Sequence, residues 1–413
     1  MSDATVTIVG AGVVGMACAV QLQRDGHRVQ VVDRGPPGEG CSRGNAGIIA
    51  VDHVLPVATP GILRRVPRML LDPTGPLAIR WGYLPTLTPW LLRFLANAAP
   101  ARVDRLGAAI AALTAPALDA WRDLLDAIEA PELIERRGWL AAYRSESGFR
   151  ADAGERQRQR ALGVAVDELA AEELRQQEPA LAPGLARGVL YPESAQALEP
   201  LLVVQRLAEA FRRNGGTLVR ADVGAIDVGE SGPRSLATDS GPIPVERLLL
   251  CGGAWSKPLA AALGHRVPLD TERGYHVHLP DPGIALRRPL LDGDRKFFLT
   301  PMATGLRLAG TVELGGLKAP PDWRRAEMLL RHARDLLPGL GEAGAARWMG
   351  FRPTFPDSLP AIGPSPRLPN TWFAFGHQHL GLTLAAITGR MVAAMIGGRP
   401  SPVDAKPYRI DRF

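Results

Sequence analysis

The chain has 413 residues, of which 46% are hydrophobic and 22% are charged, a composition typical of a folded enzyme with room for two domains. Lys and Arg (48) exceed Asp and Glu (42), and the formal net charge of +6 is spread along the chain. No basic stripe is interleaved with aromatic residues, so a nucleic-acid partner is not expected.

Cysteine spacing and the start of the chain bear on localisation. Cys18, Cys41 and Cys251 are far apart, so a disulfide framework is not expected. A core strand is predicted from Thr5 onward, which leaves no room for a signal peptide, and no apolar run approaches the roughly 20 residues of a membrane span. We therefore expect a cytoplasmic protein, either free or peripheral on the inner membrane.

The first 34 residues follow a pattern of strand, glycine turn, helix and strand. Residues 6–9 form a short β-branched strand, and Gly-Ala-Gly-Val-Val-Gly follows at 10–15. A helix is predicted over 16–24 and a second strand over 28–33. A unit of this kind that ends on an acid binds a dinucleotide.

Each special residue of this unit has a physical role. Gly10 permits the tight turn, Gly12 lets backbone N–H groups approach a pyrophosphate, and Gly15 lets the helix pack closely on the strand. The phosphates then lie at the positive end of the helix, and Asp33 accepts the ribose hydroxyls. The unit alone does not distinguish FAD from NAD.

The loop after Asp33 leads into Cys-Ser-Arg-Gly-Asn-Ala-Gly at 41–47. Small residues and an Asn beside a dinucleotide fold indicate backbone and hydroxyl contacts with a flat ligand, and a plain glycine loop is the alternative. Cys41 is interpreted as another small residue, with a reactive thiol as the alternative.

Residues 54–99 are predicted to be short apolar helices broken by prolines, with five arginines among them. Apolar side chains interleaved with arginines over 63–95 are typical of a helix that lies on a membrane surface. Helices packed on the domain with their arginines outward are the alternative. Residues 103–130 follow as an amphipathic helical region.

Strands and helices then succeed one another to the end of the chain. Three consecutive strands without intervening helices, at 273–280, 296–300 and 305–311, predict an antiparallel sheet. Two further glycine turns follow buried strands, at 252–253 and 376–381. The other predicted elements are strands at 138–143, 217–220, 245–251 and 371–375, and helices at 152–178, 200–213, 324–337 and 382–396.

The three glycine turns predict the cofactor and the fold class. In a doubly wound sheet the carboxyl ends of the strands converge on the ligand crevice, and a ligand that spans three such turns is long, which favours FAD. We expect an α/β FAD-binding Rossmann-like domain and an α+β substrate domain with an antiparallel sheet. The first comprises residues 1–80, 150–264 and 346–413, and the second comprises residues 81–149 and 265–345.

Arg352 lies in an otherwise apolar strand, Met-Gly-Phe-Arg-Pro at 349–353. A buried guanidinium needs a partner, and its fork suits a carboxylate. Tyr275 is predicted to stand beside Arg352 and to complete a pocket for a substrate carboxylate. A structural ion pair with Asp357 or Glu272 is the alternative.

Two His-x-His pairs, His276 with His278 and His377 with His379, can each place two imidazoles on one face of a strand. No acidic or thiol ligand accompanies them, so a metal site is not expected. Hydrogen-bonded histidines are the simpler interpretation.

Six motifs together resemble one enzyme family. They are Gly-Asn-Ala-Gly (44–47), Leu-Leu-Asp-Pro-Thr-Gly-Pro-Leu (70–77), Leu-Asp-Thr-Glu-Arg-Gly-Tyr-His (269–276), Ala-Gly-Thr-Val-Glu (309–313), Gly-Phe-Arg-Pro-Thr-Phe-Pro-Asp-Ser-Leu-Pro-Ala-Ile-Gly (350–363) and Phe-Gly-His-Gln-His-Leu-Gly-Leu-Thr (375–383). Over nearly its whole length the chain resembles the D-amino-acid oxidase superfamily of FAD enzymes. The branch it resembles most is that of the bacterial D-amino-acid dehydrogenases, including D-hydroxyproline dehydrogenases and glyphosate oxidoreductase.

The resemblance implies a non-covalent FAD and the residues that hold it. The first glycine turn and Asp33 would hold the ADP half, residues 42–47 would border the isoalloxazine, and the helix N-terminus at 379–383 would cover its pyrimidine end. The implied cofactor-binding residues are Gly10, Gly12, Val13, Val14, Gly15, Asp33, Arg34, Ser42, Asn45, Ala46, Gly47, Val223, Gly252, Gly253, Trp255, His379, Leu380, Gly381, Leu382 and Thr383.

The resemblance also implies a reaction. Such enzymes oxidatively deaminate D-amino acids: a hydride leaves Cα for flavin N5, the imine is hydrolysed to a 2-oxo acid, and a quinone or another non-oxygen acceptor takes the electrons. Arg352 would take the substrate carboxylate and Tyr275 would close over it, and the further catalytic candidates are His276 and His377. The alternatives are an oxidase or dehydrogenase of secondary amines (D-proline, cis-4-hydroxy-D-proline, sarcosine or a glyphosate-like substrate) and a non-catalytic flavin-binding subunit.

Three departures from the family pattern surround the expected site. Gln378 stands where close relatives commonly have Gly, Asp52 and His53 stand where they have small polar residues, and Cys251-Gly252 replaces Ala-Ala. Substrate identity is therefore not carried over from the family.

Overall fold

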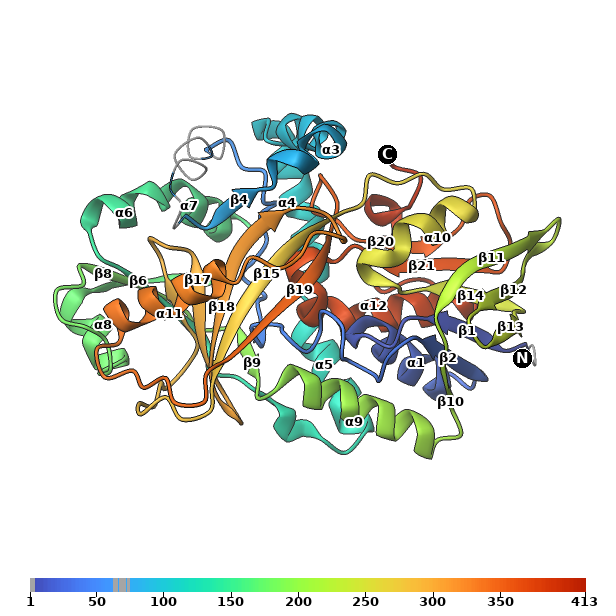
Figure 1. Cartoon of the computed structure of the whole chain (residues 1–413), viewed down its shortest axis with the longest axis horizontal. Coiled ribbons are helices and arrows are strands. Elements are labelled where there is room, and N and C mark those ends of the chain that lie inside the picture. The colour runs from blue at the N-terminus through green and yellow to red at the C-terminus, as the bar shows by residue number, and fades with distance from the viewer. Residues whose placement is uncertain (1–3, 62–65, 67–71, 73–74) are drawn as a thin grey trace.

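The computed structural model of the protein describes residues 4–61, 66, 72 and 75–413. Figure 1 shows two large sheets toward opposite ends of the long axis. The strands β15 (Asp270–Leu279) and β19 (Ala346–Thr354) of the nine-stranded sheet lie toward the middle of the molecule. The expected combination of a parallel sheet and a separate, mainly antiparallel sheet is confirmed.

The six-stranded sheet is the one predicted for the dinucleotide fold. Its strand order is β10-β2-β1-β14-β21-β20; β20 runs antiparallel to β21 and the other pairs are parallel. The side chains of Val6, Ile8 and Leu248 are fully buried, as expected for parallel strands covered on both faces. The strands are β1 (Val6–Val9), β2 (Val29–Asp33), β10 (Thr217–Arg220), β14 (Arg247–Leu250), β20 (Ala361–Pro364) and β21 (Thr371–Phe375).

Two helices from opposite ends of the chain pack against each other beside this sheet. They are α1 (Val13–Arg24) and α12 (Gly381–Ile396). A Cβ at Gly389 would lie 2.9 Å from the carbonyl oxygen of Ala17, so glycine permits the close approach.

The helical stretch Gln378–Ile396, which contains α12, has the length and composition of a membrane span, and it is the one such stretch among the described residues. However, 78% of its most apolar window is buried inside the structure. Burial of this extent is typical of a core helix.

The nine-stranded sheet is mainly antiparallel, as predicted for residues 273–311. β15 pairs antiparallel with both β18 and β19, whereas β6 with β16 and β4 with β18 are parallel. The helix α11 (Arg324–Leu336) packs on β15 and β18. The remaining strands are β4 (Leu77–Ile79), β6 (Trp139–Tyr143), β7 (Asp167–Ala170), β8 (Arg187–Tyr191), β16 (Leu290–Asp292), β17 (Phe297–Met302) and β18 (Gly305–Leu314).

Smaller elements complete the fold. One three-stranded sheet contains β3 (Ile48–Ile49), β9 (Ala195–Ala197) and β5 (Ile134–Glu135), and another contains β11 (Val223–Gly229), β12 (Gly232–Thr238) and β13 (Gly241–Pro244). The other helices are α3 (Leu84–Asn97), α4 (Pro100–Thr114), α5 (Ala117–Ala127), α6 (Glu146–Ala151), α7 (Ala153–Ala161), α8 (Ala171–Gln177), α9 (Pro200–Arg213) and α10 (Ser256–Ala262).

The helix predicted over 152–178 is wrong in its middle, where the structure has the strand β7. β7 pairs antiparallel with β8, so that Asp167 lies opposite Leu190. Backbone hydrogen bonds to a neighbouring strand outweigh the helix propensity of this polar sequence.

The structure bears only in part on two other expectations, the short helices over 54–99 and the domain boundaries. Most of the arginine-rich stretch 63–71 lies outside the described residues, and α3 continues through Pro89. The predicted domain boundaries remain a prediction, although four strands from ranges that we assigned to the cofactor domain, β4, β7, β8 and β19, pair within the nine-stranded sheet.

Candidate active site

The first glycine turn is packed so tightly that only glycine fits at two of its positions. Gly10 has φ +112°, and a Cβ there would lie 2.4 Å from the carbonyl oxygen of Cys251. A Cβ at Gly15 would lie 1.9 Å from the carbonyl oxygen of Gly10. Gly12 is different, because its Cβ position is open apart from Ser42 Oγ at 3.4 Å. The turn therefore offers free space at the N-terminus of α1.

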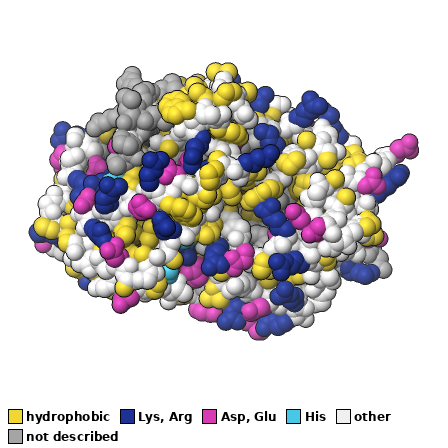
Figure 2. Space-filling model, viewed as in Figure 1, with side chains coloured by type: hydrophobic (Ala, Val, Ile, Leu, Met, Phe, Trp, Pro, Cys, Tyr) yellow, Lys and Arg dark blue, Asp and Glu magenta, His cyan; other side chains and the backbone are white. Residues whose placement is uncertain are grey.

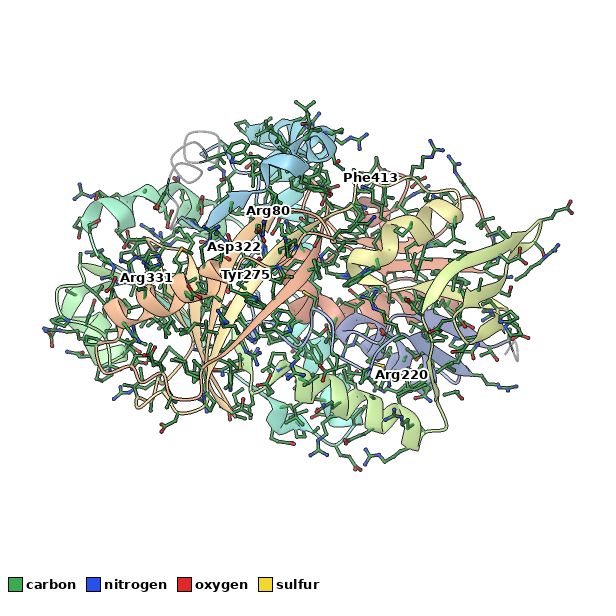
Figure 3. All side chains as sticks on the ribbon, in the orientation of Figure 1. Arg80, Arg220, Tyr275, Asp322, Arg331 and Phe413 are labelled. Atoms are coloured by element: carbon green, nitrogen blue, oxygen red, sulfur yellow. The ribbon has the colours of Figure 1, made fainter. Side chains whose placement is uncertain are left out.

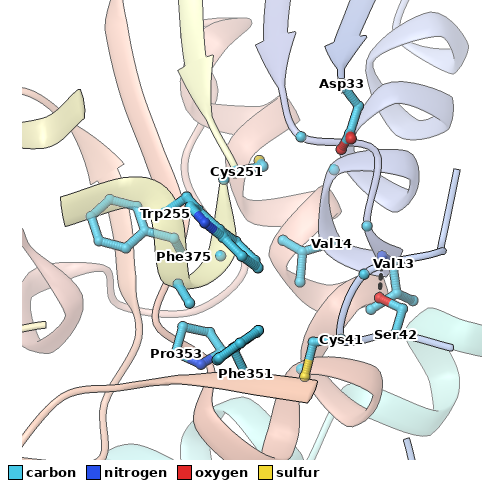
Figure 4. Close-up of a pocket in the computed structure, with 18 of the residues that line it drawn as sticks. Val13, Val14, Asp33, Cys41, Ser42, Cys251, Trp255, Phe351, Pro353 and Phe375 are labelled. Carbon is cyan, nitrogen blue, oxygen red and sulfur yellow. Dashed lines mark hydrogen bonds between the residues drawn. The ribbon is translucent and has the colours of Figure 1, made fainter. Parts of the chain in front are cut away.

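Two side chains fix the loops around this turn. Asp33 accepts hydrogen bonds from the backbone N–H of Ala11 (2.7 Å, to Oδ2) and of Gly35 (2.9 Å, to Oδ1). Ser42 Oγ accepts from the N–H of Val13 at 3.0 Å, as the dashed line in Figure 4 shows. The turn, the acid and the loop 41–47 thus form one preorganised wall.

A cavity of about 460 Å³ lies at the carboxyl ends of β1, β2, β14 and β21, where all three glycine turns meet. Its size and its position match the ligand crevice of a doubly wound sheet. The predicted cofactor-binding residues that line it are Gly10, Gly12, Val13, Val14, Gly15, Asp33, Arg34, Ser42, Asn45, Val223, Gly252, Gly253, Trp255, Gly381 and Leu382.

The other predicted cofactor-binding residues lie outside this lining: Ala46, Gly47, His379, Leu380 and Thr383. Thr383 Oγ1 instead accepts from the N–H of Ala50 at 3.0 Å, which ties α12 to the segment after the loop 41–47. Gly47 accepts from the N–H of Ala197 at 2.7 Å.

Phe351, an aromatic residue that we did not predict, also lines the cavity, beside the predicted Trp255. The guanidinium carbon of Arg34 lies 3.9 Å from the ring centroid of Trp255, which meets Phe351 edge-to-face at 5.5 Å. Figure 4 shows Trp255 and Phe351 across the cavity from Val14. Phe351 precedes Arg352 in the apolar strand 349–353, so the prediction of that strand near the site was the sequence feature that could have identified it.

The face of β15 and β19 that carries Arg352 meets the loop 41–47. The register pairs Glu272 with Arg352 and His276 with Trp348, so these four side chains share one face. Trp348 packs over Gly44, where a Cβ would lie 1.9 Å from its ring, and its ring centroid lies 4.9 Å from that of His276.

Buried Arg307 is a further residue that we did not predict. It donates to the carbonyl oxygens of Arg43 (3.2 Å) and Asn45 (2.8 Å), and it pairs with Glu199 at 2.9 Å. These contacts anchor the loop 41–47 on the sheet.

Arg352 has an available guanidinium. Its Nη1 donates to the carbonyl oxygen of Thr311 at 3.0 Å, and the group lies over Gly274, whose Cβ position is 2.2 Å from Nη2. Among the described residues no carboxylate oxygen lies within 4.0 Å of it, because Asp357 pairs with Arg412 (2.8 Å) and Glu272 with His379 (3.0 Å). The expected structural ion pair with either acid is therefore not formed.

The expected position of Tyr275 is wrong. Strand alternation places Tyr275 opposite Met349, on the face of the sheet away from Arg352. Its buried hydroxyl donates to Glu313 at 2.6 Å and accepts from the N–H of Asp322 at 2.8 Å. Figure 3 shows Tyr275 beside Asp322 and Arg80.

The four histidines have four different partners, and that of His379 is Glu272. His276 Nδ1 lies 3.3 Å from the carbonyl oxygen of Gly44, and His278 Nε2 lies 2.9 Å from that of Thr304. His377 Nε2 lies 3.0 Å from Thr388 Oγ1, inside the α12 packing. No group of three or more His, Cys, Asp and Glu in the described part of the chain is arranged to hold a metal.

Burial lowers the pKa of both His276 and His377 to about 3, and Arg307 adds to the effect at His276. Both imidazoles are therefore neutral near pH 7, so neither is expected to act as a charged proton donor in the predicted catalytic set. Because each folded-state pKa lies below the ordinary value of 6.5, each group stabilises the fold above pH 6.5 and its contribution is lost as the pH falls.

This predicts the behaviour of a His377→Gln variant, measured by urea unfolding across an acid pH series. As the pH falls below 6.5, the free energy of unfolding of the wild type should decrease more steeply than that of the variant, by on the order of 1 kcal/mol per pH unit. The pH profile of kcat/KM should be the same for both proteins. An ionisation in that profile that disappears in the variant would restore the catalytic role.

Two of the departures from the family pattern have structural explanations. Gln378 has φ +53°, and its Nε2 donates to Thr354 Oγ1 (2.8 Å) and to Glu272 (3.3 Å). Those bonds hold a non-glycine residue in a left-handed conformation. Asp52 is buried and accepts from Trp139 Nε1 at 2.8 Å, whereas His53 is more exposed.

Comparison with known proteins agrees with this geometry. The family described as FAD dependent oxidoreductase (DAO) matches residues 5–395. A D-amino-acid oxidase of Bradyrhizobium diazoefficiens is 40% identical, over 99% of this chain and 98% of the relative. D-amino acid dehydrogenase 2 of Ralstonia nicotianae is 32% identical, over 98% and 100%.

The fold also matches solved structures. Glycine oxidase from Geobacillus kaustophilus superposes with a TM-score of 0.76 at 23% identity, covering 99% of both chains. L-proline dehydrogenase from P. horikoshii gives a TM-score of 0.73 at 16% identity, over 100% and 98%. At these identities the similarity concerns the fold.

Proposed function

The chain belongs to the DAO family of FAD-dependent oxidoreductases, and from this premise we propose that it oxidises D-amino acids to 2-oxo acids. FAD is its cofactor. The cavity fits that group, because Cβ atoms at Gly10 and Gly15 would clash with backbone while Gly12 leaves room at the start of α1. When bound, FAD supplies the acceptor of two electrons.

The residues that would hold FAD follow from the cavity lining. The N–H groups at the start of α1 would face the pyrophosphate, and Asp33 would take the ribose hydroxyls. Trp255 and Arg34 would cover the cofactor at the second glycine turn. The loop 41–47, anchored by Arg307, would border the ring system.

Arg352 is the single observation that carries the substrate class. A guanidinium that has no carboxylate within 4.0 Å among the described residues, on the face that meets the loop 41–47, suits the carboxylate of an amino acid. The hydrogen bond from Arg352 to the Thr311 carbonyl oxygen would orient the guanidinium. A guanidinium held in this way would fix the substrate carboxylate and thereby position the substrate Cα. The departures at Gln378 and Asp52 leave the preferred side chain open.

We also propose that the electrons pass to a quinone or another non-oxygen acceptor, as the names of the dehydrogenase relatives suggest. The relative named as an oxidase favours oxygen as the second candidate. D-amino acids and secondary amines, including D-proline and sarcosine, should be assayed with a quinone analogue and, separately, under air with peroxide detection. Turnover with the quinone and little peroxide supports our proposal, and stoichiometric peroxide identifies an oxidase.

We further propose a cytoplasmic enzyme that is peripheral on the inner membrane through α3 and the short 3-10 helix η1 (Trp81–Tyr83) that precedes it. The side chains of Trp81 and Leu92 are 69% and 63% exposed, and Leu95 is also exposed. Figure 2 shows hydrophobic side chains gathered at the upper edge, over α3. Arg93 lies on the same helix, and an apolar surface with an adjacent cation suits an anionic bilayer.

The membrane contact is tested with a Trp81→Ala/Leu92→Ala variant. Burying each side chain contributes about 1.5–3 kcal/mol, so binding to vesicles that contain phosphatidylglycerol should weaken at least tenfold. Cosedimentation measures the bound fraction, and pure phosphatidylcholine vesicles are the control. Unchanged binding of the variant would contradict the contact.

A further inference from the structure

A second cavity of about 550 Å³ lies between α3, the start of α4 and the C-terminal segment. Figure 1 shows the C-terminus close to α3, and Figure 3 shows Phe413 at the same edge of the molecule. None of its lining residues lines the cofactor cavity. Its polar lining residues are Arg93, Asn97, Arg102, Arg105, Asp357, Lys406 and Arg412.

The charge of this cavity is strongly unbalanced. Of the described residues that line it, five have cationic side chains, whereas Asp357 alone has an acidic one. Asp357 is already paired with Arg412 by two contacts, of 2.8 and 3.3 Å. Arg102 donates to the carbonyl oxygen of Ala96 at 3.2 Å.

Arg93, Arg105 and Lys406 have no carboxylate within 4.0 Å among the residues that the structure describes. Of the neighbouring acids, Asp104 pairs with Arg158 at 3.6 Å, and Asp404 accepts from the backbone N–H of Lys406, not from its ammonium group, at 3.0 Å. Three clustered cations without counter-charge repel one another, and a multivalent anion between them would remove that repulsion.

The rest of the wall is apolar. Leu106 and Leu359 are buried, and Ala109, Pro356 and Pro407 complete this surface. A volume of about 550 Å³ is within the range of small-molecule sites. The cavity can therefore hold an organic group beside the anion.

We infer that this cavity is a second ligand site, which binds a phosphate-bearing organic anion. Arginine forks match phosphate oxygens geometrically, and Arg93, Arg105 and Lys406 supply the charge. Two sources share this chemistry: a free organic phosphate and the headgroup of an anionic lipid, whose acyl chain would lie beside the exposed Leu92 and Leu95. The inference does not depend on the proposed reaction.

The test compares two variants that lose the same charge. Arg105→Gln/Lys406→Gln changes the cavity and leaves the α3 surface intact, and Arg212→Gln/Arg213→Gln changes two exposed arginines on α9, at the opposite edge in Figure 1. FAD-loaded protein is titrated calorimetrically with inorganic pyrophosphate at constant ionic strength. Cosedimentation with phosphatidylglycerol vesicles forms the second arm.

We expect the cavity variant to bind pyrophosphate, the vesicles or both at least tenfold more weakly than the wild type and the α9 variant do. A loss confined to pyrophosphate identifies a free phosphate as the ligand, and a loss confined to vesicles identifies a headgroup. Turnover of the FAD-loaded cavity variant should equal that of the wild type, which shows that it is folded. No binding in either arm, or equal losses in the two variants, would overturn the site.

Discussion

Replacing Arg352 with Ala should raise KM for D-amino acids about 30-fold or more. The expected loss is about 2 kcal/mol, as for other charge-assisted contacts, and each 1.4 kcal/mol corresponds to about tenfold in affinity. The reason is that Glu272, the acid opposite Arg352 on β15, pairs with His379 at 3.0 Å. Among the described residues no carboxylate lies within 4.0 Å of this guanidinium, which donates to the carbonyl oxygen of Thr311. Steady-state kinetics of the FAD-loaded variant measures the effect.

Arg347 provides the matched control for this prediction. It lies on the same strand, on the opposite face, and pairs with Glu327 at 3.0 Å. Arg347→Ala should leave KM within about twofold of the wild-type value, because exposed ion pairs contribute little. An unchanged KM in Arg352→Ala, or equal changes in both variants, would remove Arg352 from the substrate site.

Replacing Gly15 with Ala should weaken FAD binding about tenfold to a hundredfold. The added Cβ would lie 1.9 Å from the carbonyl oxygen of Gly10, and relieving such a clash typically costs about 1–3 kcal/mol. The turn and α1 must then separate, which disturbs the N–H groups at the helix start. Fluorescence titration of the apoprotein with FAD measures the affinity.

Gly154 is the control for Gly15. It also lies in a helix, α7, but nothing lies within 4 Å of its Cβ position. Gly154→Ala should therefore leave FAD affinity unchanged and slightly stabilise the fold through better helix propensity. If Gly15→Ala binds FAD like the wild type, the first turn does not hold the cofactor.

The dinucleotide unit was predictable because its determinants are local. Gly10, Gly15 and Asp33 act within one strand–turn–helix–strand segment, and the hydrophobic period fixes its elements. Local sequence also indicated the antiparallel strands of residues 273–311, since no helical period interrupts them.

The substrate side was less predictable, because it depends on strand register. Alternation along β15 separates Tyr275 from His276, but only the pairing with β19 shows which of them shares a face with Arg352. The same pairing brings Trp348 over Gly44 from more than 300 residues away along the chain. Burial of His377 against Thr388 is likewise a tertiary property.

The most direct test of the central claim is anaerobic reduction of the FAD-loaded protein by matched D- and L-amino acids, followed in the visible flavin absorption band. The proposed function predicts that D-amino acids bleach the band in a single turnover and that their L-enantiomers do not. A band that persists with every amino acid and secondary amine would contradict the proposal and would favour a non-catalytic flavin-binding subunit.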